Sequence, residues 1–118
     1  MNRPLALIVE DDPQLNQIFC LTLEPSFEIE SFADGAQAIV RLSEVVPQVI
    51  VLDINLPGAS GAQVLKAIRD DVRLRTTRVI LATANTQEAE ILRDQSDIVL
   101  LKPISPTQLR EFANRLKN

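Results

Sequence analysis

The chain has 118 residues, a length typical of one domain that can bury its own hydrophobic core. It contains one cysteine and no histidine, which excludes an internal disulfide and a structural zinc site and favours a reducing, cytoplasmic compartment. The net charge of −4 argues against direct binding to nucleic acid or to an anionic membrane, so we expect proteins or small ligands as partners.

The first third of the chain predicts a strand, a helix and an edge strand. Residues 5–9 form an apolar run that ends in three acidic residues, as a buried strand does and a signal peptide or membrane span does not. Asp12 and Pro13 then suit the N-cap and the first position of a helix. Its expected apolar face carries Leu15, Ile18, Phe19, Thr22 and Leu23, and its polar face carries Gln14, Asn16 and Gln17. Residues 27–32 alternate between apolar and polar side chains, the pattern of a half-exposed edge strand.

The apolar run at residues 49–52 predicts a central strand that reaches Asp53. The run is rich in β-branched residues and has no polar face, which is typical of a strand covered by helices on both sides of a sheet. Pro57 and Gly58 mark a loop after it. Ligands of an open parallel sheet bind at the carboxyl ends of the strands, so Asp53 is a candidate functional residue.

Two further strands and four further helices complete the expected series. Residues 79–82 and 98–101 are apolar runs, of which the first ends at Thr83 and the second at Lys102-Pro103. Residues 105–108 have the sequence of a capping box at the start of the last helix. The apolar residues that predict these helices are Ala36, Ile39, Val40 and Leu42; Val64, Leu65 and Ile68; Ala89, Ile91 and Leu92; and Leu109, Phe112, Ala113 and Leu116.

Five strands that alternate with helices predict an α/β fold, a doubly wound five-stranded parallel sheet with helices on both faces. In the flavodoxin-like strand order 2-1-3-4-5, the first and third strands are neighbours. This order brings Glu10 and Asp11 beside Asp53. Thr83 and Lys102 end the next two strands, so we expect these five residues at one edge of the sheet.

Three carboxylates at one edge would repel one another unless a cation neutralised them. Few carboxylates, one backbone carbonyl and several waters suit Mg²⁺ better than Ca²⁺, which takes more ligands. An alternative interpretation is that Glu10, Asp11 and Asp12 only cap the first helix, where acidic side chains interact favourably with the helix dipole. Capping alone leaves Asp53 unexplained.

A carboxylate beside Mg²⁺, with an ammonium group and a hydroxyl within reach, suits a phosphoryl group. Asp53 would be the nucleophile and would form an aspartyl phosphate. Lys102 would neutralise charge on the transferring oxygens, and Thr83 would donate a hydrogen bond to one of them. Lys102 and Thr83 also have ordinary interpretations, as a charged strand end and as a common strand residue.

These motifs resemble those of the receiver domain of two-component response regulators, and the resemblance covers residues 1–118. The matching motifs are Glu10-Asp11, Asp53, Leu56-Pro57 with Gly61, Thr83-Ala84 and Lys102-Pro103. The strand order given above is also that of the family, so the two expectations are not independent. The chain would be a single receiver domain, either complete or the N-terminal part of a longer regulator.

The resemblance implies a role for each matching residue. Asp53 would accept a phosphoryl group from a phosphohistidine of a sensor histidine kinase or a phosphotransfer protein. Asp11, Asp53 and the backbone carbonyl of Asn55 would bind Mg²⁺, and Glu10 would act on the ion largely through water. The phosphoryl oxygens would be held by Thr83, Lys102 and the amide of Ala84.

The resemblance also implies a phosphoacceptor rather than an enzyme, which signals to a downstream protein or an attached output domain. In this family, phosphorylation rearranges the surface of the fourth helix, fifth strand and fifth helix, where a homodimer would also form. This chain has Val99 at a position that is usually aromatic, and residues 83–102 form a shorter segment without the usual glycine. Because valine is small and stiff, we expect residues 84–92 to carry more of the change than residue 99.

Three other functions remain open from the sequence. A receiver-like interaction module that works without phosphorylation rests on Val99 and the short segment, but the retained chemistry at all the site positions weighs against it. An aspartate-based phosphohydrolase would also use a strand-end aspartate, but it typically has a second aspartate two residues later, where this chain has Asn55. A flavin or nucleotide binder would need a glycine-rich loop after the first strand, which this sequence lacks.

Overall fold

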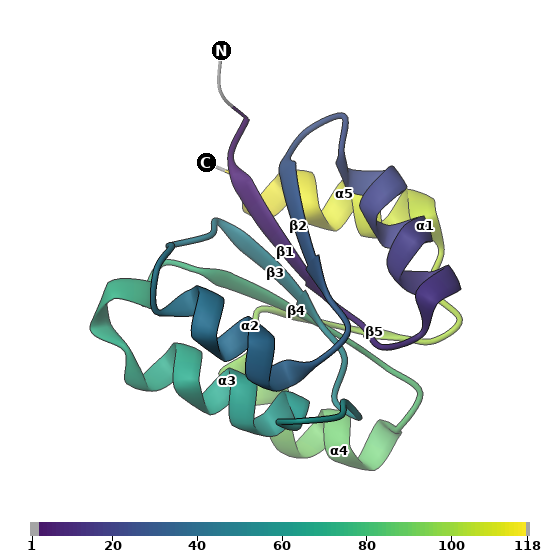
Figure 1. Cartoon of the computed structure of the whole chain (residues 1–118). Helices are drawn as coiled ribbons and strands as arrows, with labels where there is room; N and C mark the ends of the chain where they lie inside the picture. Colours follow the sequence, from purple (N-terminus) through teal and green to yellow (C-terminus); the bar gives the residue numbers. More distant parts are fainter. Residues whose placement is uncertain (1–2, 118) are drawn as a thin grey trace.

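The computed structural model describes residues 3–117, in which strands and helices alternate along the chain (Figure 1). The strands are β1 (Leu5–Val9), β2 (Glu28–Phe32), β3 (Val49–Leu52), β4 (Arg78–Thr83) and β5 (Ile98–Leu101). The helices are α1 (Pro13–Leu23), α2 (Gly35–Leu42), α3 (Gly61–Asp70), α4 (Thr86–Leu92) and α5 (Pro106–Leu116), with short 3-10 helices η1 (Val72–Leu74) and η2 (Arg93–Gln95). Within residues 3–117, no helix is both long and apolar enough to cross a membrane.

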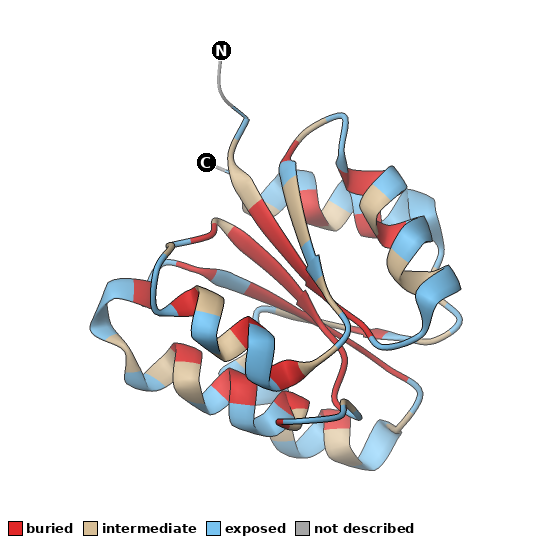
Figure 2. Cartoon of the chain, viewed as in Figure 1, coloured by how far each residue is buried: buried red, intermediate tan, exposed pale blue. Residues whose placement is uncertain are grey.

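All five strands are parallel and pair in the order β2-β1-β3-β4-β5, which confirms the predicted doubly wound α/β fold. Helices α1 and α5 cover one face of the sheet, and α2, α3 and α4 cover the other (Figure 1). Side chains alternate along a strand, so β3 supplies both cores. Ile50 and Leu52 pack with α2 and α3, whereas Val49 and Val51 pack with α1 and α5. Strand β3 is buried throughout, as its apolar run predicts (Figure 2).

Four apolar residues expected on buried helix faces, Ile18, Ala36, Val40 and Ile91, lie at the surface instead. Ile18 of α1, Val40 of α2 and Ile91 of α4 are 43%, 65% and 75% exposed. In α2 the buried residues include Ala38 and Leu42, which are four positions apart, and Val40 between them points away from the core. The prediction was wrong because apolar character alone does not fix which stripe of a helix is buried when the helix carries surplus apolar residues.

Side-chain caps fix the starts of several helices. Asp12 caps α1, as predicted, by accepting hydrogen bonds from two backbone N–H groups at 2.9 Å and 3.3 Å. Ser105 caps α5 by accepting from the N–H of Gln108 at 3.3 Å, but the reciprocal bond of the predicted capping box is not formed among the described residues. A complete capping box starts α3 instead, where Ser60 and Gln63 exchange hydrogen bonds of 3.2 Å and 2.9 Å. Helix α3 thus begins at a fixed point after the loop that follows β3.

Asp97 holds the short segment between α4 and β5. Its Oδ2 accepts hydrogen bonds from the backbone N–H of Val79 at 2.7 Å and from Arg69 Nη2 at 3.2 Å, and its Oδ1 accepts from Arg78 Nη1 at 3.1 Å. Arg69 also donates through Nε to the carbonyl of Gln95 at 2.7 Å. One carboxylate and two guanidinium groups therefore fix the entry to β5, although no glycine precedes this strand.

Replacing Asp97 with alanine should lower the free energy of unfolding by about 1–3 kcal/mol, because a backbone N–H and two arginines lose their charged acceptor. Asp70→Ala is the matched control, since its carboxylate pairs with the exposed Lys66 at 2.7 Å and solvent screens that pair. Urea unfolding measures both variants. Equal losses of stability would show that Asp97 does not fix the segment.

Candidate functional site

The candidate residues come directly after the strands, where backbone hydrogen bonds of the sheet still hold them. The N–H of Glu10 donates to the carbonyl of the last residue of β2, and the N–H of Asp53 donates to that of β1, both at 3.0 Å. The N–H of Lys102 donates to the carbonyl of Thr83, the last residue of β4, at 2.8 Å. Each residue extends the parallel ladder by one bond, so the sheet rather than a flexible loop sets its position.

The sheet brings three carboxylates together, as predicted. Glu10, Asp11 and Asp53 each offer an oxygen, and these oxygens all lie within 4.8 Å of one another. Glu10 and Asp53 are buried, with 1% and 6% of their surface exposed, whereas Asp11 is exposed. Lys102 Nζ lies 2.7 Å from Glu10 Oε1 and 3.4 Å from Asp53 Oδ2. One ammonium group therefore pairs with the two buried carboxyl groups of the cluster.

Helix capping accounts for only part of this acidic segment. The residue that caps α1 is Asp12. The Glu10 side chain turns inward instead, where its Oε2 accepts from the N–H of Asp12 at 3.1 Å and its Oε1 reaches Lys102. The capping interpretation therefore holds for Asp12 and does not account for the placement of Glu10 or Asp53.

Burial and ion pairing have opposite effects on the pKa values of Glu10 and Lys102. Removal from water raises the pKa of Glu10, and the Asp53 charge adds to this rise, while Lys102 and the Asp12 amide reverse it only in part. Burial by itself would lower the pKa of Lys102, but the interactions with Glu10 and Asp53 outweigh it and raise that pKa above its usual value. Lys102 therefore stays positively charged at neutral pH.

The carboxylate cluster fits a hard divalent cation. Its ligand atoms are all oxygens, and three carboxylates are enough for Mg²⁺, which keeps several of its waters. Among the described residues, no donor makes an aligned hydrogen bond to Glu10 Oε1, which the Lys102 ammonium reaches as an ion pair. Buried carboxylate oxygens rarely lack a hydrogen bond unless a cation or water completes their surroundings.

The hydrogen bonds of Asp53 and Thr83 leave one carboxylate oxygen of Asp53 and the hydroxyl proton of Thr83 without a backbone partner among the described residues. Asp53 Oδ1 accepts from the N–H of the next residue at 2.7 Å, which leaves Oδ2 facing Lys102. Thr83 is fully buried at the end of β4, and its Oγ1 accepts from the N–H of Asn85 at 3.0 Å. That bond uses a lone pair of the hydroxyl oxygen and leaves the hydroxyl proton free to be donated.

Asn55 and Ala84, the other predicted site residues, are exposed and follow β3 and β4 outside the carboxylate cluster. The loop that carries Asn55 is tightly held. The N–H of Gly61 donates to the carbonyl of Ile54 at 2.7 Å, and a Cβ on Gly61 would lie 2.2 Å from the carbonyl oxygen of Asp53. Only glycine permits this approach, so Gly61 fixes the loop against the site.

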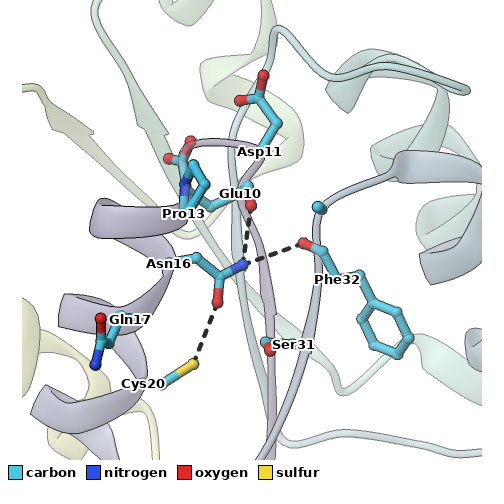
Figure 3. A pocket seen from close by; sticks show the side chains of 9 residues that line it. Glu10, Asp11, Pro13, Asn16, Gln17, Cys20, Ser31 and Phe32 are labelled. Atoms are coloured by element: carbon cyan, nitrogen blue, oxygen red, sulfur yellow. Dashed lines mark hydrogen bonds between the residues drawn. The ribbon is translucent and has the colours of Figure 1, made fainter.

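Asn16 is a site residue that sequence reasoning missed, because it was assigned to the polar outer face of the first helix. Its side-chain amide donates to the carbonyl of Glu10 at 2.9 Å and to that of Phe32 at 3.3 Å. It also lines an open pocket of about 510 Å³ between α1 and the end of β2 (Figure 3). Asparagine near the start of a helix is common, so no sequence pattern distinguishes this role.

The profile of the response regulator receiver domain family matches residues 6–114 of the chain. The chain belongs to this family and is a receiver domain of a two-component response regulator. It is 33% identical over 107 residues to the phosphate regulon transcriptional regulatory protein PhoB of Klebsiella pneumoniae, which covers 87% of this chain and 47% of that protein. The chain thus spans about half the length of this and similar relatives.

Two solved receiver structures resemble the whole domain. The chemotaxis response regulator CheY4 of Vibrio cholerae superimposes with a TM-score of 0.88 at 25% identity, over 98% of this chain and 99% of that chain. The receiver domain of the sensor histidine kinase PA1611 from Pseudomonas aeruginosa PAO1 has a TM-score of 0.88 at 25% identity and covers 97% of each chain. That structure has a magnesium ion coordinated in its active site cleft. Receiver domains bind Mg²⁺ at an acidic site, and this chain has such a cluster.

Gly61→Ala should lower the free energy of unfolding by about 1–3 kcal/mol and shift the amide resonances of Asp53 and Asn55, because the new methyl group would collide with backbone atoms. The gain in helix propensity, at most about 1 kcal/mol, is too small to offset this. Ala62→Gly, at the next exposed position, should cost about 1 kcal/mol through propensity alone and leave those resonances in place. Urea unfolding and NMR measure both effects. Unmoved Asp53 and Asn55 resonances in Gly61→Ala would contradict the close approach.

Proposed function

We propose that this receiver domain accepts a phosphoryl group on Asp53 from a phosphohistidine of a sensor histidine kinase or a phosphotransfer protein. The observation that carries the proposal is the convergence of Asp53 with Glu10, Asp11 and Lys102 at one edge of the sheet. Asp53 is held by the sheet and lies 3.4 Å from the positively charged Lys102 ammonium. The chain has no histidine, so a phosphohistidine donor belongs to another domain.

During the transfer, a carboxylate oxygen of Asp53 forms a bond to phosphorus while the bond from phosphorus to the donor imidazole breaks. The imidazole leaves with the electron pair of that bond. The Lys102 ammonium, 3.4 Å from Asp53 Oδ2, can neutralise charge on the transferring oxygens. The free hydroxyl proton of Thr83 can be donated to one of these oxygens, and the amide of Ala84 is a further donor.

Mg²⁺ would be held by Asp11, Asp53 and the carbonyl of Asn55, with Glu10 contributing largely through water. When bound, the ion supplies positive charge that offsets the repulsion between the phosphoryl oxygens and the carboxylates.

Lys102 stabilises the buried Glu10 carboxylate as well as facing Asp53. Its removal would leave an uncompensated buried charge, so the same side chain serves the stability of the site and its chemistry.

Two other functions are less well supported. An interaction module that works without phosphorylation has no use for Asp53, Thr83 and Lys102 in this arrangement. A phosphohydrolase of the aspartate-based kind needs an acid two residues after its nucleophile, and Asn55 at that position does not transfer protons. Receiver domains are not enzymes in the usual sense, and we propose that this one assists only the phosphorylation and dephosphorylation of its own aspartate.

Receiver domains interact with histidine kinases and output domains. We propose the same two kinds of partner for this domain, with the surface of α4, β5 and α5 as the one that responds to phosphorylation. Ile91 of α4 and Leu101 of β5 are 75% and 48% exposed and give this surface apolar side chains for an output domain or a homodimer. The net charge of −4 does not favour direct contact with nucleic acid.

Incubation with acetyl phosphate and Mg²⁺ should add one phosphoryl group to the wild-type protein, as measured by intact mass. Asp53→Asn should prevent this addition, because a carboxamide is a poor nucleophile. Asp12→Asn is the matched control, since it makes the same chemical change at the cap of α1 and should be labelled like the wild type. Equal labelling of the Asp53→Asn protein would overturn the assignment.

Phosphorylation should shift the conformation only in part, with the change concentrated in residues 84–92. A hydrogen bond from Thr83 to the phosphoryl group contributes about 1.5–3 kcal/mol, whereas a shift from 1:99 to 99:1 needs about 5.5 kcal/mol. Thr83 Oγ1 also holds the start of this segment through the N–H of Asn85, while Val99 is small and packs against the core.

Amide hydrogen exchange with and without Mg²⁺ and beryllium fluoride, a mimic of the phosphoryl group, measures where this change occurs. The expected result is altered exchange in residues 84–92 and little change at Val99. Large changes centred on Val99 and β5, with residues 84–92 unaffected, would contradict the expectation.

A further inference from the structure

The side chain of Asn16 lies at the point where two strands end. Strands β1 and β2 are paired up to Val9 and Phe32. One residue further along, Asn16 Nδ2 donates to the Glu10 carbonyl at 2.9 Å and to the Phe32 carbonyl at 3.3 Å (Figure 3). For the Glu10 carbonyl, a side chain of α1 thus supplies the donor that a neighbouring strand would supply within the sheet, while the Phe32 carbonyl also accepts from the N–H of Glu10.

The orientation of the Asn16 amide follows from its partners. Cys20 Sγ donates to Asn16 Oδ1 at 3.4 Å, and the two carbonyl oxygens of Glu10 and Phe32 accept from Nδ2. A reversed amide would place Oδ1 against two carbonyl oxygens that have no proton to donate. Burial raises the pKa of Cys20, so its thiol keeps the proton that this arrangement uses.

The Glu10 carbonyl belongs to the peptide that leads into Asp11. This peptide is planar, so fixing the direction of its C=O fixes the direction in which the chain enters Asp11. Glu10 is already held at its N–H by Phe32 and at its carboxylate by the Asp12 amide and Lys102. Asp11 is exposed, and its place in the cluster therefore depends on the backbone that carries it.

We propose that Asn16 is a positioning residue for metal binding. Through the Glu10 carbonyl it fixes the Glu10–Asp11 peptide, which keeps the Asp11 carboxylate within 4.8 Å of that of Asp53. This inference rests on the proposed function of the carboxylate cluster. A merely structural role, linking α1 to β2, would use the same two hydrogen bonds, so metal affinity has to be measured beside stability.

Titration with Mg²⁺, followed by NMR, tests the proposal in four proteins. The wild type should bind saturably, and Asn16→Leu, which removes the donor but keeps the size, should bind about tenfold more weakly. Thr22→Val is the matched control, because it removes a buried 2.7 Å hydrogen bond to the Ile18 carbonyl in the same helix, away from the site. Thr22→Val should lose stability and keep the wild-type affinity. Asn16→Ser retains a shorter donor, should have an intermediate affinity, and replaces Asn16→Leu if that variant does not fold.

NMR spectra of the metal-free proteins measure the effect of Asn16→Leu on the Glu10–Asp11 peptide independently of Mg²⁺ binding. In Asn16→Leu the Glu10 carbonyl loses its donor, so the Glu10 carbonyl and Asp11 amide resonances should move before any Mg²⁺ is added. In Thr22→Val these resonances should stay where they are in the wild type. Unmoved resonances in Asn16→Leu would show that Asn16 does not set the direction of this peptide.

Three outcomes of the titration would also overturn the proposal. Wild-type affinity in Asn16→Leu would leave Asn16 as a structural link between α1 and β2. Equal weakening in Asn16→Leu and Thr22→Val would assign the effect to general loss of stability. If the wild type bound no Mg²⁺, both the metal site of the proposed function and the role of Asn16 would be wrong. If the wild type binds saturably but Asn16→Leu binds equally well, only the role of Asn16 is wrong.

Discussion

Lys102 places its ammonium group 2.7 Å from the Glu10 carboxylate and 3.4 Å from that of Asp53, and the carboxyl edge of the sheet depends on this ion pair. Carboxylates that are removed from water destabilise a fold unless a cation or hydrogen bonds compensate them. The three residues follow β5, β1 and β3, and β4 lies between β3 and β5. The long lysine side chain therefore extends past the end of β4, where Thr83 lies. The strand order thus places the Thr83 hydroxyl between the strand that leads to Asp53 and the strand that leads to Lys102.

The site divides into parts fixed by the sheet and parts carried by loops. Glu10, Asp53 and Lys102 donate backbone hydrogen bonds to the last residues of neighbouring strands, so their Cα positions belong to the sheet. Asn55 and Ala84 lie on exposed segments that follow β3 and β4. A nucleophile and its counter-charge benefit from fixed positions, since preorganised charges need no rearrangement during the reaction. Under the proposed function, the exposed segment after β4 responds to the phosphoryl group, whereas Gly61 holds the loop after β3 against the site.

The strands and the edge of the sheet that carries the site could be predicted from the sequence. Each apolar run ends at a polar residue, and the carboxyl ends of parallel strands lie at the same edge of a sheet. Asp53 could be found in this way. The buried stripes of the helices were harder to predict, and Val40, which is apolar, lies exposed. Asn16 and Asp97 could not be found, because their roles depend on partners such as Phe32 and Val79 that are distant in the sequence. Polar residues that bridge elements have no local pattern.

A crystal structure of the domain grown with Mg²⁺ and beryllium fluoride measures most directly whether Asp53 accepts the phosphoryl group in a metal site built from its neighbours. The predicted result is one metal ion bound by Asp11 and Asp53, with the beryllium fluoride attached to a carboxylate oxygen of Asp53 and the Lys102 ammonium in contact with a fluorine. Beryllium fluoride attached elsewhere, or a metal ion bound away from these carboxylates, would contradict it.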